Sequence, residues 1–287
     1  MAEPLDEMLT TLDLQATGAR TAEDIFTGTS HHMPTGRIYG GQVFAQAVVA
    51  AQRTIAPDRF AHSAHGYFLR AGDVTLPLTF SVDRIFDGRS FSTRNVRAFQ
   101  NGVPIFSMIA SFQDLDPGLE HQLDMPKGLP QPEELESSER NLDQFDEAAQ
   151  WARKRPFELR HIEPPLYLSF QGERQPHQAV WMRANGPLPD DPHLHRAALA
   201  YASDFGTIEP ILRVHGLSFS EPGIRTASLD HTVWWHRPAR VDDWLLLVME
   251  GVNAIGGRGL GQGRFYTRDG VLVASIAQEG MLRLPLT

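Results

Sequence analysis

Three polar side chains in the last third of the chain have the chemistry needed to activate a water molecule. Asp204 carries a carboxylate toward the C-terminal end of an Ala- and Leu-rich helical stretch, where the helix dipole does not stabilise it. Ser228 offers a hydroxyl that donates and accepts hydrogen bonds, and Gln278 offers an uncharged amide with two donors and an acceptor. Hydrolysis without a covalent intermediate needs a base for water, groups that hold the water, and donors that polarise the electrophile.

From position alone, each of the three also has an ordinary structural interpretation: a solvated helix-ending carboxylate, a strand serine and a strand-end amide. The sequence contains no Gly-x-Ser-x-Gly elbow, no phosphate-binding loop and no dinucleotide fingerprint. It also contains no cysteine, which excludes a thiol nucleophile, a disulfide and a cysteine-ligated metal. Water activation without a covalent intermediate therefore stays open.

The histidines do not form a metal-binding pattern. His231 and His236 are an odd number of positions apart, so in a strand they would face opposite sides. The histidines at 31–32 and 193–195 have no complementary carboxylate pattern, so we expect neither a metal nor a cofactor. Some arginines near repeated motifs could either contact phosphates or be solvated edge charges: Arg89, Arg94, Arg258 and Arg264.

Length and charge narrow the class of protein. A chain of 287 residues suits two domains that each bury a core, and a formal net charge of −9 argues against non-specific nucleic-acid binding. The first 18 residues lack the basic and apolar segments of a signal peptide, and no apolar run is long enough to span a bilayer. The last three residues are not a peroxisomal address. We therefore expect a cytoplasmic protein without integral membrane association.

Two blocks of the sequence repeat the same pattern. Gly88-Arg89, a strand-like run and the turn Asn101-Gly102 recur as Gly257-Arg258, a strand-like run and the turn Asp269-Gly270. The copies are roughly 168 residues apart, with a slip of about one residue, so the repeat unit is a whole fold. A site shared between two pseudo-equivalent halves is therefore expected.

Both halves are predicted to place one buried helix before several antiparallel strands. In the first half the helix is expected at 40–54, where glycines let another backbone approach, and the strands at 65–70, 78–85, 91–100 and 103–114. The Asn-Gly pair at 101–102 favours a hairpin. In the second half a helix is predicted at 193–212, with short strands in 166–183 and others at 228–237, 244–252, 263–268 and 271–278.

A buried helix wrapped by a curved antiparallel sheet is the hotdog architecture. The sequence therefore predicts an α+β tandem double hotdog whose sheets are continuous across the pseudo-dimer. Residues 1–114 form the first hotdog and 166–287 the second, which carries the active site. Between them, 115–165 is rich in Pro, Glu, Asp and Ser and reads as a linker with an acidic helical segment at 133–150.

Taken together, these motifs resemble the acyl-CoA thioesterase II family, the double-hotdog thioesterases of bacteria and peroxisomes. The resemblance covers nearly the whole chain. In the first half it rests on Arg-Ile-Tyr-Gly-Gly-Gln-Val at 37–43, His-Gly-Tyr-Phe-Leu-Arg-Ala-Gly-Asp at 65–73 and Asp-Gly-Arg-Ser-Phe-Ser-Thr-Arg at 87–94. In the second half it rests on Ala-Ser-Asp at 202–204, Ser-Leu-Asp-His at 228–231, Trp-His-Arg-Pro at 235–238, Phe-Tyr-Thr at 265–267 and Ala-Gln-Glu-Gly at 277–280.

The resemblance implies hydrolysis of fatty acyl-CoA to free fatty acid and CoA. In that family an Asp, a Thr or Ser, and a Gln jointly activate the attacking water, and these positions fall on Asp204, Ser228 and Gln278. Ser replaces the Thr that the family often has, which keeps the hydroxyl with looser rotamer control. The matching positions of the first half are apolar or small, at 48–51 and 109–110, so only the second half is expected to hold the full triad.

Three other functions use the same architecture. An acyl-thioester hydratase or dehydratase would need a His with an Asp or Glu in one site, and no local motif supplies this pair. A non-catalytic acyl-CoA-binding sensor would usually carry a basic DNA-binding segment, which is missing, and a purely structural pseudo-dimer would leave the polar trio without a reason. Acyl-CoA is therefore the expected partner. Hotdog sheets commonly pair further, so by analogy we expect a homodimer or homotetramer.

Overall fold

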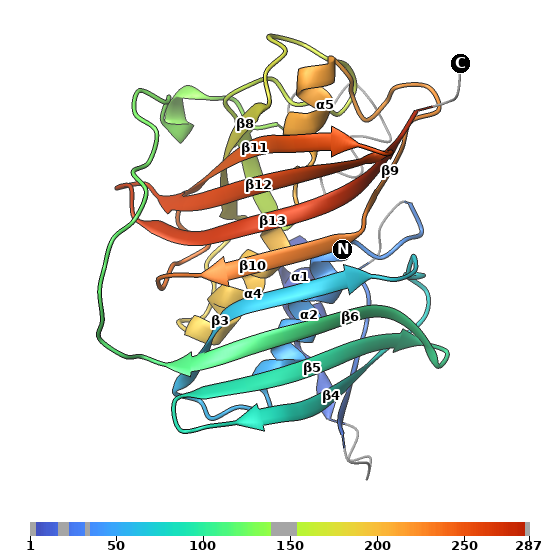
Figure 1. Ribbon diagram of the computed structural model, residues 1–287, viewed down its shortest axis with the longest axis vertical. Helices are drawn as coiled ribbons and strands as arrows, with labels where there is room; N and C mark the ends of the chain where they lie inside the picture. The colour runs from blue at the N-terminus through green and yellow to red at the C-terminus, as the bar shows by residue number, and fades with distance from the viewer. Residues whose placement is uncertain (1–3, 17–22, 32–34, 139–153, 285–287) are drawn as a thin grey trace.

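One antiparallel sheet of thirteen strands dominates the described part of the chain (Figure 1). The computed structural model describes residues 4–16, 23–31, 35–138 and 154–284. The main path of the sheet runs β1-β2-β4-β5-β6-β3-β10-β13-β12-β11-β8-β7, and β9 pairs with β13 off this path. The helices are α1 Pro4–Leu12, α2 Gly40–Gln52, the 3-10 helix η1 Pro132–Glu134, α4 Pro192–Ala202 and α5 Glu209–His215.

Each half contributes a curved set of strands. The first half holds β1 Gln15–Ala16, β2 Asp24–Gly28, β3 Arg59–Phe68, β4 Leu78–Asp87, β5 Phe91–Gln100 and β6 Val103–Asp114. The second holds β7 Phe157–His161, β8 His177–Ala184, β9 Arg225–Ser228, β10 Asp230–Trp235, β11 Leu245–Ile255, β12 Arg258–Thr267 and β13 Leu272–Arg283. These elements confirm the predicted α+β class.

The two halves join where β3 lies beside β10 in the middle of the sheet (Figure 1). Residues 63–67 pair antiparallel with residues 230–234, so the sheet is continuous across the pseudo-dimer, as predicted. Trp234 is partly exposed on the outer face, whereas Trp235 is buried on the inner face. This alternation is what a strand with one face on the core requires.

The central helix of the first half is almost completely buried. Every residue of α2 from Gly41 to Ala51 is buried, and the helix packs against α4 of the second half. A Cβ atom at Gly41 would lie 2.3 Å from the carbonyl oxygen of Tyr201, the residue before the end of α4. The prediction that glycines here admit another backbone is therefore confirmed.

The hairpin of the first half follows the predicted bounds. The strands β5 and β6 cover the two predicted runs, and the turn between them places Asn101 at φ 49° and Gly102 at φ 75°. Two successive left-handed residues match the right-handed twist of the flanking strands. The alternation of apolar and polar residues and the Asn-Gly turn were sufficient to predict this hairpin, because both patterns involve only neighbouring residues.

The helix predicted at 193–212 is wrong, because the chain forms α4 and α5 with a bend at 203–208 between them. Gly206 adopts the left-handed conformation, at φ 76°, and Pro210 has no N–H to donate to the carbonyl of Gly206 four residues earlier. The bend crosses β12, where a Cβ atom at Gly261 would lie 2.1 Å from the carbonyl oxygen of Thr207. Asp204 therefore lies in this bend rather than within a helix.

The strands around the other two candidate residues also differ from prediction. The run predicted at 228–237 is divided, since β9 ends at Ser228 and β10 begins at Asp230. The N–H of Leu229 donates a hydrogen bond to the carbonyl of Glu279, and the carbonyl of Leu229 accepts one from the N–H of Phe68. Gln278 lies inside β13 rather than at a strand end, and the region predicted at 166–183 forms only β8, which starts at residue 177.

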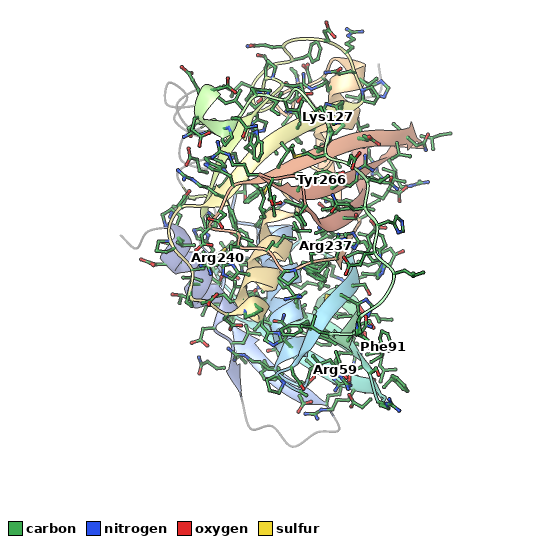
Figure 2. All side chains as sticks on the ribbon, turned by 90° about the vertical axis from the view of Figure 1, so that its left-hand side faces the viewer. Arg59, Phe91, Lys127, Arg237, Arg240 and Tyr266 are labelled. Carbon is green, nitrogen blue, oxygen red and sulfur yellow. The ribbon has the colours of Figure 1, made fainter. Side chains whose placement is uncertain are left out.

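The stretch predicted as a linker, 115–165, does more than connect the halves. It contains β7, which pairs with β8, and it covers the outer face of the second half's sheet. Trp181 of β8 donates its indole N–H to the carbonyl of Pro130 at 2.9 Å, and the hydroxyl of Tyr266 lies 3.5 Å from the carbonyl of Asp124. Figure 2 shows Lys127 of this segment on the same side as Tyr266.

This covering produces a second, smaller core around Trp181, Trp244 and Leu246 on the outer side of the sheet. As a result, β8 and β11 carry nearly continuous apolar runs, as strands buried on both faces do. Most of the acidic helix predicted at 133–150 lies outside the described residues, apart from η1 and the residues up to 138. The domain boundaries at 114 and 165 stay a prediction.

We expect Gly261→Ala to lower the free energy of unfolding by about 1–3 kcal/mol, because the new methyl group collides with the backbone at Thr207. Urea unfolding followed by circular dichroism measures the change. Gly118→Ala is the matched control, because a Cβ atom there meets nothing within 4 Å. Equal midpoints for both variants would contradict the close approach of the bend to β12.

Candidate active site

The structure brings the three predicted residues together at one point. Oδ1 of Asp204 accepts a hydrogen bond from Nε2 of Gln278 at 2.8 Å and a longer one from Oγ of Ser228 at 3.4 Å. Nε2 of Gln278 also donates to Oγ of Ser228. The bend after α4, the end of β9 and the middle of β13 each supply one of these side chains.

A fourth group at this point comes from the first half. The backbone N–H of Gly41, in the first turn of α2, donates to Oδ2 of Asp204 at 2.8 Å. Helix N-termini carry partial positive charge and unpaired N–H groups, so they stabilise an ionised carboxylate. The sequence analysis did not predict this donor, because every residue except proline has a backbone N–H and the residue type does not mark it. The one indication was the Gly40-Gly41 pair at the start of the predicted helix.

Burial tunes the acidity of Asp204. Removal of its carboxyl group from water raises the pKa to about 6, although hydrogen bonds from Gln278, Gly41 and Ser228 act in the opposite direction. The carboxyl group is therefore ionised above about pH 6 and is a stronger base than an exposed aspartate. It also lines a cavity, so a small molecule there can reach it.

His231 is a buried residue of β10 that contacts the C-cap residue of α4. Its Nε2 lies 2.7 Å from Oγ of Ser203, and burial lowers the pKa of His231 to about 4 although a hydrogen bond with the Gln278 side chain raises it. The imidazole is thus neutral beside Gln278. His236 is exposed and contacts Ser275, which confirms that the two histidines face opposite sides.

The cavity beside Asp204 has a volume of about 460 Å³ and lies under the inner face of the second half's sheet. It reaches from Gln278 on β13 to His161 on β7. Apolar side chains form most of its wall, among them Ile38, Leu159, Val180, Phe205, Phe219 and Met249. Such a cavity suits a ligand with an extended apolar part.

The equivalent place in the first half holds an arginine. Asp204 is the first residue after the C-cap of α4, and the first residue after the C-cap of α2 is Thr54 rather than one of residues 48–51. Arg94 on β5 pairs with Ala110 on β6, just as Gly261 on β12 pairs with Gln278 on β13. Nε of Arg94 donates a hydrogen bond to Oγ1 of Thr54 at 2.7 Å. Its guanidinium fills the space and lies 2.7 Å from Oδ1 of Asp87.

Arg94 is buried, so it has a structural role rather than a phosphate-binding one. Arg258 and Arg264 form exposed ion pairs with Glu279 and Glu250. Within the described ranges, no group of three or more His, Asp and Glu side chains could hold a metal ion. None of the described helices is long and apolar enough to cross a membrane.

Comparison with known proteins identifies the family that this chain resembles. A family profile described as acyl-CoA thioesterase matches residues 151–281, and one described as acyl-CoA thioesterase N-terminal domain matches residues 29–113. Acyl-coenzyme A thioesterase 8 of Mus musculus is 39% identical over 91% of this chain and 85% of its own length. Acyl-CoA thioesterase 2 of Haemophilus influenzae is 38% identical over 90% of this chain and 92% of its own.

The crystal structure of an acyl-CoA thioesterase II from Mycobacterium marinum superposes with a TM-score of 0.78 at 37% identity, covering 98% of both chains. The chain belongs to the acyl-CoA thioesterase II family. Membership confirms the tandem hotdog fold and the enzyme class, a thioester hydrolase, that the sequence predicts.

We expect Gln278→Leu to raise the pKa of Asp204 above about 6, because the amide donates to the ionised carboxylate and so favours it. NMR titration of carbon-13-labelled aspartate carboxyl groups reads this value directly. Gln262→Leu, an exposed position on the neighbouring strand, is the matched control and should leave the titration unchanged. An unaltered pKa in Gln278→Leu would show that the amide does not hold the carboxylate.

Proposed function

We propose that the chain hydrolyses fatty acyl-CoA thioesters to free fatty acid and CoA, using water activated by Asp204, Ser228 and Gln278 without a covalent intermediate. The observation that carries the proposal is the partly buried carboxylate of Asp204, held by three donors and open to a largely apolar cavity. A carboxylate removed from water requires such partners, and here its pKa of about 6 suits a base at neutral pH.

In this mechanism the water lies between Asp204 and the thioester carbonyl carbon. Asp204 accepts a proton as the water oxygen attacks, and the Ser228 hydroxyl and Gln278 amide fix its position. The tetrahedral intermediate then collapses, the carbon–sulfur bond breaks, and the CoA thiolate takes a proton from Asp204. Fatty acid and CoA leave, and the carboxylate is restored.

The developing oxyanion needs a donor, and the first turn of α2 supplies it. The N–H groups of Gln42 and Val43 in this turn donate to the carbonyl of Tyr39, and that of Gly41 donates to Asp204. We assign the N–H of Gly40, the first residue of the helix, to the oxyanion. A Cβ atom at Gly40 would lie 2.7 Å from Oδ2 of Asp204, so any side chain there would occupy the space that the reacting group needs.

The hydratase or dehydratase alternative requires a basic His beside an acid. The cavity does contain such a pair, since Nε2 of His161 lies 3.7 Å from Oε2 of Glu209. Burial, however, lowers the pKa of His161 to about 3, which makes its imidazole a weak base. The trio around Asp204 has no use in that chemistry, so we favour hydrolysis. The expected cytoplasmic location and homodimer or homotetramer stay predictions.

We expect Asp204→Asn to reduce kcat for acyl-CoA hydrolysis by about 10²–10⁴-fold, because the amide cannot accept the proton from water. Thiol release with a panel of acyl-CoA chain lengths measures the loss. Asp83→Asn, an exposed carboxylate on β4, is the control and should retain activity. Near-normal kcat in Asp204→Asn would remove Asp204 from the mechanism. Hydration of crotonyl-CoA without thiol release would support the hydratase instead.

The pH dependence should report the same carboxyl group. Because Asp204 must be ionised to act as a base and its pKa is about 6, kcat/KM should fall as the pH decreases through about 6. Initial rates of thiol release in overlapping buffers, with folding checked by circular dichroism at each pH, give the profile. A flat profile between about pH 5 and 7 would be inconsistent with Asp204 as the base.

A further inference from the structure

Two arginines face each other where β9 runs beside the C-terminal end of β13 (Figure 1). Arg225 and Arg283 are direct cross-strand partners, and both are exposed. Side chains at directly opposed positions stand on the same face of the sheet, where two like charges repel each other. Neither guanidinium forms an ion pair or a hydrogen bond with any residue in the described part of the chain. An anion bound at this pair would remove the repulsion.

Other arginines on the same face of the sheet are compensated. Arg258 pairs with Glu279 at 3.1 Å, and Arg264 pairs with Glu250 at 2.9 Å. In a chain whose formal net charge is −9, an uncompensated pair of cations is a local exception. Clustered guanidinium groups are typical of sites that bind phosphate, because their fixed N–H groups match its oxygen atoms.

The arginine pair lies next to the opening of the cavity at Asp204. Thr226 and Ala227 of β9 line this cavity, and Ala227 is exposed. Because side chains alternate along a strand, Ala227 stands on the same face as Arg225, whereas Ser228 points to Asp204. Arg225 is three residues from Ser228, which is roughly 10 Å at about 3.3 Å per residue. The cavity therefore opens at β9, on the side that carries the two arginines.

A third arginine borders the same opening. Arg37, in the segment before α2, is exposed and lines the cavity together with Thr35. Asp73 lies opposite Arg37 in an isolated β-bridge, but its Oδ1 accepts hydrogen bonds from the N–H and the hydroxyl of Thr75. The guanidinium of Arg37 forms no ion pair with Asp73 or with any other carboxylate among the residues that the structure describes. Three cations thus border the route into the cavity.

The chemistry of a CoA thioester matches this order of groups. A flexible pantetheine arm joins its sulfur to a nucleotide that carries a pyrophosphate and a further phosphate. These charged groups must stay in water or meet cations, so they cannot enter a largely apolar cavity. With the thioester at Asp204, the pantetheine arm therefore leaves through the opening, past β9, and brings the phosphates to the outer side of the strand.

We propose that Arg225, Arg283 and Arg37 form a phosphate subsite, the arginine subsite, which binds the nucleotide end of CoA and selects CoA thioesters over pantetheine thioesters. This inference rests on the proposed function for the position of the thioester. The arginine subsite contributes binding rather than chemistry, because it lies apart from the reacting atoms. Its loss should therefore raise KM for acyl-CoA and leave kcat unchanged.

The test is binding of two thioethers that cannot be hydrolysed and that share one alkyl chain, one built on CoA and the other on pantetheine. Calorimetry uses the full chain at low ionic strength, where exposed charges are least screened. We expect the CoA thioether to bind at least about tenfold more tightly than the pantetheine thioether. The double variant Arg225→Gln/Arg283→Gln should lose about tenfold for the CoA thioether and bind the pantetheine thioether unchanged.

The matched control is the double variant Arg89→Gln/Arg97→Gln, which removes two exposed positive charges from the first half's sheet. It should keep the full preference for the CoA thioether. The same outcome in Arg225→Gln/Arg283→Gln would overturn the proposal, because the phosphates would then be bound elsewhere. An equal loss for both thioethers would overturn it too, since the effect would not depend on phosphate.

Equal affinity of the unmodified protein for the two thioethers would also contradict the arginine subsite, whatever the variants do. The readout does not require turnover, so it separates this inference from the proposed function. A protein that shows the preference but does not hydrolyse acyl-CoA would refute the proposed function and leave the arginine subsite intact. Hydrolysis of acyl-CoA without the preference would do the reverse.

Discussion

The organisation of this site depends on keeping one carboxylate ionised while it is partly shielded from water. Asp204 achieves this because donors converge on it from three directions: a serine and an amide of its own half, and the first turn of α2 in the other. Each donor depends on a larger feature. Gly41 must lack a side chain for the helices to approach, and Gly261 must lack one for the bend to cross β12. Burial keeps His231 neutral beside Gln278. The chemistry of the site is thus distributed over the whole core.

The two halves use one piece of architecture for opposite purposes. In the second half a glycine on β12 leaves room for a bend that carries an acid. In the first half Arg94 takes the equivalent place, and its guanidinium bonds to Thr54 at the end of α2. A long cation that satisfies the helix end closes the space in which a second reaction centre would form. The start of the first half's helix nevertheless contributes the N–H of Gly41 to Asp204.

Local signals in the sequence were enough for much of this fold. The strands β5 and β6 were predictable because alternation and an Asn-Gly turn act over neighbouring residues. The trio was predictable from motifs around Asp204, Ser228 and Gln278, whereas their proximity depended on the fold. The bend after α4 was not predictable, because Gly206 and Pro210 break the helix over a strand some fifty residues away. Glu209 gave no signal either, since an acid at a helix start is ordinary.

The seam between β3 and β10 joins strands that hold equivalent places in the two copies. Separate copies of an ancestral unit could have met along these same edges as a symmetrical dimer, with two identical catalytic centres per pair. Covalent fusion releases that symmetry, because each copy then meets only its own partner and can accumulate changes that the other does not share. A fused chain can therefore lose one catalytic centre without weakening the pairing between β3 and β10. The copy without a centre can then evolve as a structural support for the other.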